Sequence, residues 1–179
     1  MSTNKIVITG GPGTGKSSII NELKKRGYIC FEEVSRQVIL DARENGVEQL
    51  FLTEPLLFSE LLLKGRTKQF IDAENHESDV VFLDRGIPDV LAYMDYVNSK
   101  YPENFINSCK NNIYDHVFIL APWQDIFKND SERYESFEQA IEIHENLLET
   151  YKKYNYHLLD VPFGTIKERT DYILKVLNL

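Results

Sequence analysis

A run of eight residues near the N-terminus, Gly10-Gly11-Pro12-Gly13-Thr14-Gly15-Lys16-Ser17, fits the pattern G-x-x-x-x-G-K-[ST] at each required position. The apolar residues 6–8 before it predict a strand, and residues 17–23 after it predict a helix. A glycine-rich turn in that context presents successive backbone N–H groups, and the helix N-terminus adds partial positive charge. Lys16 then reaches the β- and γ-phosphates, and the Ser17 hydroxyl ligates Mg²⁺. The pattern predicts a nucleoside triphosphate site lined by Gly11, Gly13, Thr14, Gly15, Lys16, Ser17 and Ser18.

An acid and an arginine, Asp84 and Arg85, come directly after the apolar strand predicted over residues 80–83. In a parallel α/β sheet, ligands lie beyond the carboxyl ends of the strands. Asp84 fits the second acidic element of enzymes that use this phosphate loop, where it supports Mg²⁺ directly or through water. Arg85 is placed to contact the transferred phosphoryl group or the acceptor. We expect function at both positions, against the plainer alternative of a helix-capping aspartate beside an incidental arginine.

A second acidic pair, Glu32 and Glu33, follows the strand predicted over residues 28–31. A carboxylate there can accept a proton from a substrate hydroxyl. Arg36 lies one helical turn beyond Glu33 and can hold a substrate anion or orient that carboxylate. We expect function at Glu33 and Arg36, whereas Glu32 is equally consistent with a site residue and with a solvated helix start.

The polar segment 121–136 follows the strand predicted over residues 116–120 and has the composition of a mobile lid. In that role Arg133 closes onto the phosphates and excludes water, with Lys128 as a further candidate. The alternative is a surface loop whose charges face solvent. Trp123, the only tryptophan, is expected to be a packing aromatic, with stacking on a base as the alternative. Residues 162–165 give a weaker signal for backbone contacts to the base.

Positioning these segments together requires parallel strands, whose carboxyl ends share one edge of a sheet. Apolar runs alternate with helical patterns along the chain, which predicts one P-loop α/β domain over residues 1–179. We expect a five-stranded parallel sheet sandwiched by helices, with a helical acceptor-side insert over residues 33–78. The predicted strands are 5–9, 28–31, 80–83, 116–120 and 156–161. The later predicted helices are 34–44, 55–72, 87–97, 136–154 and 166–177.

The composition is that of an ordinary globular domain, with 42% hydrophobic and 27% charged residues among 179. No stretch approaches the ~20 apolar residues that span a bilayer, and no signal peptide is expected. Cys30 and Cys109 show no metal-ligand spacing and are not expected to pair, which favours a reduced, cytoplasmic protein. The net charge of −8 argues against broad nucleic-acid binding, so the expected partner is a small-molecule acceptor. The oligomeric state stays open.

Five segments together resemble a known family: G-G-P-G-T-G-K-S, F-E-E-V-S-R, V-F-L-D-R-G-I-P-D-V-L-A-Y, E-R-Y-E-S and L-L-D-V-P. They are similar to small AAA-type ATPases of the P-loop NTPase class, related to the nicotinamide riboside kinase domain and to nucleoside and nucleotide kinases. The D-R-G element is also similar to the D-R-[YS] element of thymidylate and deoxynucleoside kinases. The resemblance implies that Lys16 and Ser17 serve the phosphates and Mg²⁺, that Asp84 and Arg85 serve catalysis and the acceptor, and that Arg133 is a lid arginine. No arginine finger or sensor region is recognised, so a ring-forming mechanical ATPase is not expected.

The expected activity is transfer of the γ-phosphoryl group of ATP, bound with Mg²⁺, to a nucleoside- or nucleotide-like acceptor. Either Glu33 or Asp84 takes the acceptor proton, and Arg85, Arg36 and Arg133 position the anions. GTP is the less expected donor, because the guanine-reading N-K-x-D motif is absent. Two alternatives remain open. One is a nucleotide-switched binding module with slow hydrolysis, and the other is a polynucleotide 5′-hydroxyl kinase, which the acidic net charge disfavours.

Overall fold

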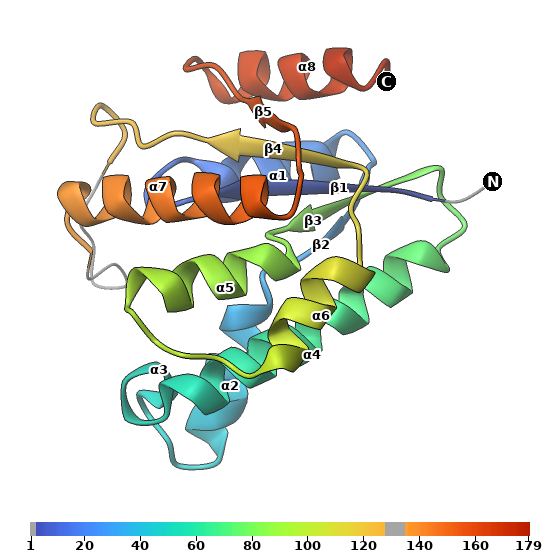
Figure 1. Cartoon of the computed structure of the whole chain (residues 1–179). Coiled ribbons are helices and arrows are strands. Elements are labelled where there is room, and N and C mark those ends of the chain that lie inside the picture. The colour runs from blue at the N-terminus through green and yellow to red at the C-terminus, as the bar shows by residue number, and fades with distance from the viewer. Residues whose placement is uncertain (1–2, 128–134) are drawn as a thin grey trace.

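Five parallel strands form one sheet, in the order β2-β3-β1-β4-β5, in the computed structural model, which describes residues 3–127 and 135–179 (Figure 1). The strands are β1 (Asn4–Gly10), β2 (Ile29–Phe31), β3 (Val80–Asp84), β4 (His116–Leu120) and β5 (Leu158–Asp160). The helices are α1 (Lys16–Lys25), α2 (Val34–Glu44), α3 (Leu50–Thr53), α4 (Pro55–Glu74), α5 (Ile87–Tyr96), α6 (Glu103–Asn111), α7 (Phe137–Lys153) and α8 (Ile166–Val176). The predicted fold class is confirmed. The sequence patterns did not predict the bounds of α3 and α6.

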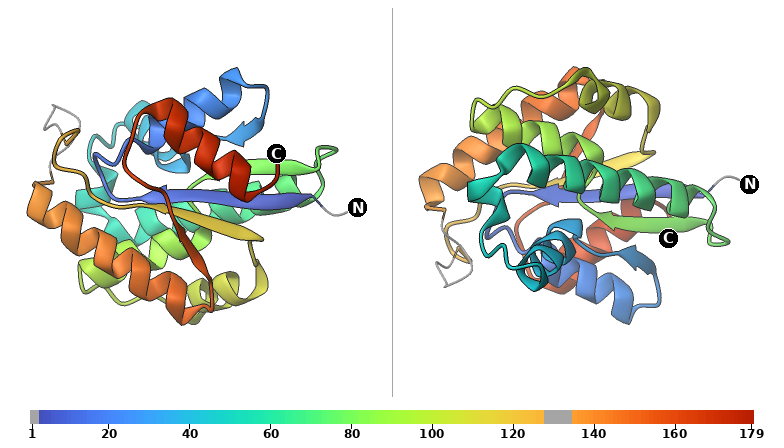
Figure 2. Two further views of the ribbon diagram at one scale, coloured as in Figure 1. Left: turned by 90° about the horizontal axis from the view of Figure 1, so that it is seen from above. Right: turned by 90° about the horizontal axis from the view of Figure 1, so that it is seen from below.

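The central strands are buried on both faces, which is why their sequences are apolar without alternation. On β1, Ile6 and Ile8 face the layer formed by α1 and α8, whereas Val7 faces the opposite layer. Val81 and Phe82 divide between the two layers in the same way on β3. Figure 2 shows α1 and α8 on one side of the sheet and α5 and α7 on the other. The sheet is therefore a rigid platform covered by helices on both sides.

The connections that leave β1 and β3 run in opposite directions. β1 leads through α1 to β2 at one edge of the sheet, and β3 leads through α5 and α6 to β4 on the far side of β1. Neighbouring strands with opposed connections open a crevice at their carboxyl ends, where α/β proteins bind ligands. The backbone N–H of Arg85 donates to the Ile8 carbonyl at 3.0 Å, so the two loops start side by side. The fold thus places residues 10–16 next to residues 84–86.

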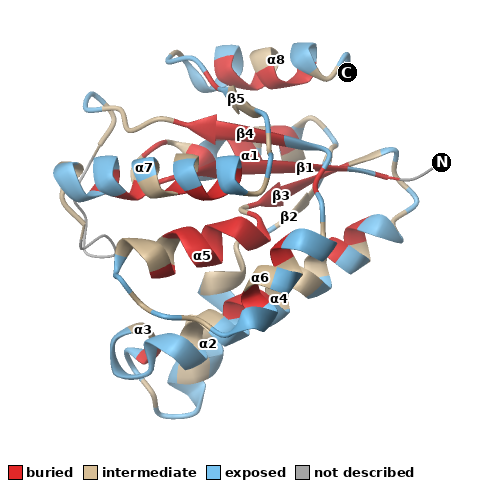
Figure 3. Ribbon diagram, viewed as in Figure 1, coloured by how far each residue is buried: buried red, intermediate tan, exposed pale blue. Residues whose placement is uncertain are grey.

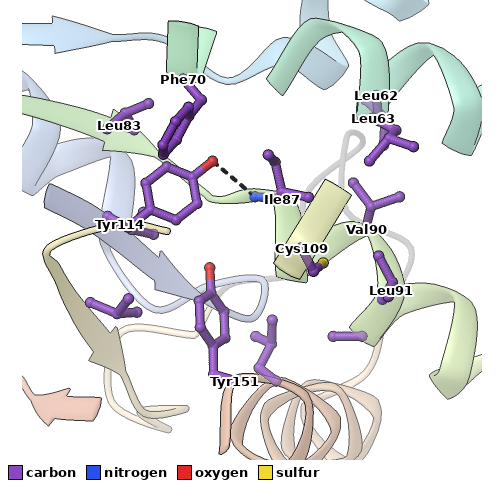
Figure 4. Close-up of a cluster of buried hydrophobic side chains, with 14 of the residues drawn as sticks. Leu62, Leu63, Phe70, Leu83, Ile87, Val90, Leu91, Cys109, Tyr114 and Tyr151 are labelled. Carbon is purple, nitrogen blue, oxygen red and sulfur yellow. Dashed lines mark hydrogen bonds between the residues drawn. The ribbon is translucent and has the colours of Figure 1, made fainter. Parts of the chain in front are cut away.

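A buried core beneath this crevice fixes the start of α5. The Tyr114 hydroxyl accepts a hydrogen bond from the Ile87 backbone N–H at 3.1 Å, among packed side chains that include Phe70 and Leu83 (Figure 4). Figure 3 shows that burial is concentrated on the central strands β1, β3 and β4 and on α5, whereas α2 and α3 are largely exposed. Within the described part of the chain, no helix is both long enough and apolar enough to cross a membrane.

The insert between β2 and β3 holds α2, α3 and the long helix α4. α2 approaches α4 at Gly65, where a Cβ atom would collide with the Cγ1 atom of Val34. Glycine in mid-helix normally weakens a helix, so this close approach explains its use here. The contact matters for the site, because Val34 directly follows Glu33.

We expect Gly65→Ala to lower the free energy of unfolding by about 1–2 kcal/mol, because overpacking at Val34 costs more than the ~1 kcal/mol that alanine returns in helix propensity. Combining it with Val34→Ala removes the colliding methyl groups and should recover part of that loss. A double-mutant cycle from urea unfolding of the two single variants and the double variant measures the coupling. Strictly additive effects would show that the two residues do not meet as described.

Candidate functional site

The glycine-rich loop takes a backbone conformation that its glycines allow. Gly13 and Gly15 have φ angles of 71° and 82°, in the left-handed region that favours glycine. Side chains would also be obstructed there, since a Cβ on Gly13 would lie 2.5 Å from the Phe127 ring and one on Gly15 would lie 2.8 Å from Arg169 Nη1. The Thr14 hydroxyl donates to the Gly11 carbonyl at 3.0 Å and closes the turn. The loop therefore has the strand–turn–helix context that the sequence predicts.

Lys16, the first residue of α1, is buried at the centre of the site. Its ammonium group forms an ion pair and a short hydrogen bond with Asp84, at the end of β3, and lies 3.8 Å from the Glu33 carboxylate. Burial and the neighbouring charge of Arg85 lower the pKa of Lys16, while Asp84 and Glu33 act in the opposite direction. Three elements that are distant in the sequence thus meet at one ammonium group.

Glu33 lies between two arginines from different parts of the chain. Arg85 Nε donates to Glu33 Oε2 at 2.5 Å, and Arg66 Nη2 donates to Glu33 Oε1 at 3.0 Å. Burial alone would raise the pKa of Glu33, but the positive charges of Arg85, Arg66 and Lys16 outweigh it and lower that pKa to about 2. Arg66 is itself fixed, because its Nη1 donates to the Gly86 carbonyl at 3.0 Å. Glu33 is therefore an ionised, oriented carboxylate at the edge of the phosphate loop.

Arg85 is held in place by Asp89 despite an unfavourable backbone conformation. Its φ of 74° is uncommon for a residue with a side chain and persists only where surrounding contacts enforce it. Arg85 Nη1 donates to Asp89 Oδ1 at 3.1 Å, and the guanidinium carbon lies 5.3 Å from the centre of the Tyr93 ring. Asp89 is fully buried and also accepts hydrogen bonds from the Thr9 hydroxyl at 2.6 Å and the Tyr151 hydroxyl at 2.5 Å. This network aims Arg85 at Glu33.

The structure brings together four of the predicted catalytic residues: Lys16, Glu33, Asp84 and Arg85. Arg36 lies exposed on α2, and the arginines that contact Glu33 are Arg66 and Arg85 instead. Glu32 is also exposed and forms an ion pair with Lys24. Ser17 and Ser18 are exposed at the start of α1, beside the loop. Arg133 and Lys128 lie outside the described residues, so the predicted lid arginine stays a prediction.

Sequence reasoning missed Arg66, which the structure places at the centre of the charge cluster. A signal was present, because Leu62, Arg66 and Phe70 recur at four-residue spacing along the buried face of α4. An arginine at such a position needs a buried partner. The pattern alone does not say that this partner is Glu33.

The oxygen ligands at the phosphate loop suit Mg²⁺ bound together with phosphates. The Ser17 hydroxyl lies in the first turn of α1, and the contact with Lys16 uses only one carboxylate oxygen of Asp84, Oδ1. Mg²⁺ usually takes one or two protein oxygens and completes its shell with water and phosphate. Where residues are described, no cluster of three or more His, Cys, Asp or Glu side chains forms an all-protein metal site. The residues therefore fit a magnesium ion that arrives with its nucleotide.

Comparison with known proteins places this site in a family. A family model described as an AAA domain matches residues 5–169. The chain belongs to this AAA domain family. A curated nucleotide-binding protein of Pseudomonas fluorescens is 23% identical in an alignment 137 residues long. The match covers 68% of this chain and 46% of that relative.

Solved structures share the fold of this AAA domain. Deoxyadenosine kinase from M. mycoides with the products dCMP and dCDP bound superimposes with a TM-score of 0.71 at 23% identity, covering 97% of this chain and 98% of the kinase chain. NadR protein in complex with NR gives a TM-score of 0.75 at 14% identity, covering 99% of this chain and 51% of that chain. At these identities the likeness concerns the fold, which is that of P-loop nucleoside and nucleotide kinases.

The pKa of Glu33 predicts how the stability of this AAA domain depends on pH. Its folded-state pKa of about 2 lies below the ordinary value of 4.5, so its contribution is present above pH 4.5 and is lost as the pH falls towards 2. We expect the loss to be about 3 kcal/mol of unfolding free energy. We expect urea unfolding across this pH range to show that the free energy of unfolding changes less with pH in Glu33→Gln than in the wild type. The difference in slope should be up to ~1.4 kcal/mol per pH unit.

Glu32→Gln is the matched control for this measurement. Glu32 is the neighbouring residue, but its side chain is exposed, so solvent screens its pairing with Lys24. The control should keep the wild-type pH dependence almost unchanged. Parallel curves for Glu33→Gln and the wild type would mean that the arginines do not hold Glu33 ionised.

Proposed function

We propose that this protein is a kinase that transfers the γ-phosphoryl group of a nucleoside triphosphate to a nucleoside- or nucleotide-like acceptor. The observation that carries the proposal is the placement of Glu33, an ionised carboxylate between Arg66 and Arg85 and 3.8 Å from Lys16 of the phosphate loop. In this proposal Glu33 is the proton acceptor, and the neighbouring cations are the anion-binding groups beside the predicted γ-phosphate position. We also propose that the protein is cytoplasmic, as expected from its two cysteines.

The donor side uses the loop and its lysine. Backbone N–H groups of residues 13–17 and the start of α1 would hold the phosphates, and Ser17 and Asp84 would hold a Mg²⁺ ion that neutralises their charge. Lys16 is paired with Asp84 in the structure. We infer that Lys16 moves from Asp84 to the β- and γ-phosphates, and Asp84 would then be available to hold a magnesium ion. ATP is the donor expected from the sequence.

The acceptor side uses Glu33 as the base and Arg85 as the anion contact. Asp84 is paired with Lys16 and would hold Mg²⁺, so in this proposal Glu33 takes the proton of the attacking hydroxyl. A carboxylate of low pKa is a weak base, yet phosphoryl transfer passes through a loose transition state that demands orientation more than early proton removal. Arg66 acts as a positioning residue, because it contacts Glu33 from the side of α4. The predicted roles of Arg36 and Arg133 in binding anions remain part of this proposal.

The comparisons support a nucleoside-like acceptor. The structural neighbours include a deoxyadenosine kinase with nucleotide products and a NadR protein in complex with NR. Both share the sheet and helices that position Glu33, Asp84 and Lys16 in this chain. The insert that holds α2, α3 and α4 contributes Arg66 and borders Glu33, so it is the part of the fold expected to select the acceptor.

The test is release of nucleoside diphosphate from Mg-ATP and Mg-GTP, with and without a pool of nucleosides, nucleotides and nicotinamide riboside. We expect release that depends on the acceptor pool, and splitting the pool then identifies the acceptor. Lys16→Ala should abolish the stimulated release, since it removes the phosphate-binding ammonium group. Lys25→Ala, an exposed lysine of the same helix, is the control and should leave it unchanged.

Slow release that no acceptor stimulates would contradict the proposal and favour a nucleotide-switched module. Unchanged acceptor-dependent release in Lys16→Ala would contradict the assignment of the phosphate loop.

A further inference from the structure

Arg169 of α8 contacts the phosphate loop although it lies 155 positions further along the chain. The residue is only 3% exposed, and its Nη1 donates to the Thr14 carbonyl oxygen at 3.0 Å. The same nitrogen lies 2.8 Å from the position that a Cβ on Gly15 would take, so the guanidinium reaches the loop because Gly15 has no side chain. A buried arginine therefore lies against the Thr14–Gly15 peptide.

The contact with Arg169 determines the direction of the Gly15 N–H bond. The Thr14–Gly15 peptide is trans, and in a trans peptide the C=O and N–H bonds are coplanar and point in opposite directions. Because the Thr14 carbonyl points towards Arg169, the Gly15 N–H points away from it. Among residues 3–127 and 135–179, this N–H donates to no other group. Gly15 is also the N-cap residue of α1, where the helix dipole favours an anion.

The charge of Arg169 is not balanced by a carboxylate of the protein. Its Nε and Nη2 atoms are buried without hydrogen-bond partners, and no carboxylate of the described residues forms an ion pair with it. Burial lowers the pKa of Arg169, and no neighbouring charge offsets that effect. The Trp123 ring lies 5.7 Å from the guanidinium carbon, but an aromatic ring carries no net charge. Burial of an unpaired charge is costly, so this cation needs negative charge from outside the protein.

We propose that Arg169 is a positioning residue for the donor phosphates, which it affects through the Thr14–Gly15 peptide without touching them. The inference rests on the proposed function, because it adds a residue to the donor side of that site. The hydrogen bond from Arg169 directs the Gly15 N–H towards the phosphates and polarises the peptide, which makes that N–H a stronger donor. The buried charge attracts the phosphates across the same peptide, where solvent and salt screen it little.

Arg26 shows what a structural arginine looks like between the same two helices. It lies on the α1 side and pairs with Glu22 at 2.9 Å and with Asp171 of α8 at 2.5 Å. Both of its partners are carboxylates, whereas the printed partner of Arg169 is a neutral carbonyl of the phosphate loop. The two arginines therefore form a matched pair for an experiment, since both connect α8 to the segment that begins with the loop.

The test compares Arg169→Met with Arg26→Met by calorimetric titration of Mg-ATP and of Mg-tripolyphosphate, without acceptor. We expect Arg169→Met to weaken both ligands by the same factor, at least about tenfold, because a charge and an orienting hydrogen bond are lost. Arg26→Met should leave both affinities within about twofold of the wild type. Unchanged affinities in Arg169→Met would overturn the inference. A loss confined to Mg-ATP would also overturn it, since tripolyphosphate has no base or sugar.

Two further readouts separate positioning from a merely structural role. Arg169→Lys keeps the charge and one donor, so it should recover part of the affinity that Arg169→Met loses. In ¹⁵N-labelled protein, Mg-tripolyphosphate should shift the Gly15 amide resonance strongly in the wild type and in Arg26→Met, and less in Arg169→Met. An equal shift in all three proteins would contradict the inference. If Arg169→Met does not fold, Arg169→Gln takes its place and should bind tripolyphosphate several-fold more weakly than the wild type.

Failure of this inference is distinguishable from failure of the proposed function. Wild-type protein that bound neither ligand would contradict both the phosphate loop assignment and the role of Arg169. Wild-type protein that bound both ligands but transferred no phosphoryl group would contradict only the kinase activity. Because the titrations contain no acceptor, the comparison of the variants decides the role of Arg169 in either case.

Discussion

A buried carboxylate between two buried arginines, Glu33 between Arg66 and Arg85, is the interaction on which the site depends. Burial of charge is costly unless each charge is paired, and removal of one partner from such a pair costs about 3–5 kcal/mol. In the cluster, the carboxylates of Glu33, Asp84 and Asp89 balance the cations of Lys16, Arg66 and Arg85. The cluster joins the end of β2, the middle of α4, the end of β3 and the start of α1. It therefore fixes the position of the phosphate loop relative to Glu33 and Arg85.

The sheet supplies the geometry that this balance requires. The connections from β1 and β3 run in opposite directions and bring the phosphate loop and Asp84-Arg85 to one edge of the sheet. Arg85 is held in its left-handed backbone conformation by the hydrogen bond to Asp89. Tyr151 and Thr9 complete the hydrogen bonds of Asp89, so α7 and β1 also support the site. A substitution at Asp89, Tyr151 or Thr9 would therefore first change the direction in which the Arg85 side chain points. The buried network thus links the packing of the core to the orientation of Glu33.

Local patterns predicted the sheet, the phosphate loop and the residues that directly follow strands. The sequence could identify candidate site residues at Asp84, Arg85 and Glu33, because the carboxyl ends of parallel strands lie at one edge of a sheet. Arg36 was expected to orient Glu33 because it is one helical turn away, but Arg66, 33 positions away, makes that contact. Long-range pairing of this kind has no periodic signature, and the same holds for Arg169 against Thr14. The bounds of α3 and α6 could not be predicted, because α3 is too short to show a helical period and α6 is largely polar.

The role of Glu33 is best measured by the single-turnover rate of phosphoryl transfer in Glu33→Gln, at saturating Mg-nucleotide and with the acceptor identified from the pool. Calorimetry on the same variant reports whether the donor still binds. If Glu33 orients and deprotonates the acceptor, the rate should fall by about 10²–10⁴ while donor affinity stays within a few-fold of the wild type. A transfer rate equal to that of the wild type, with donor binding intact, would contradict the central role given to Glu33.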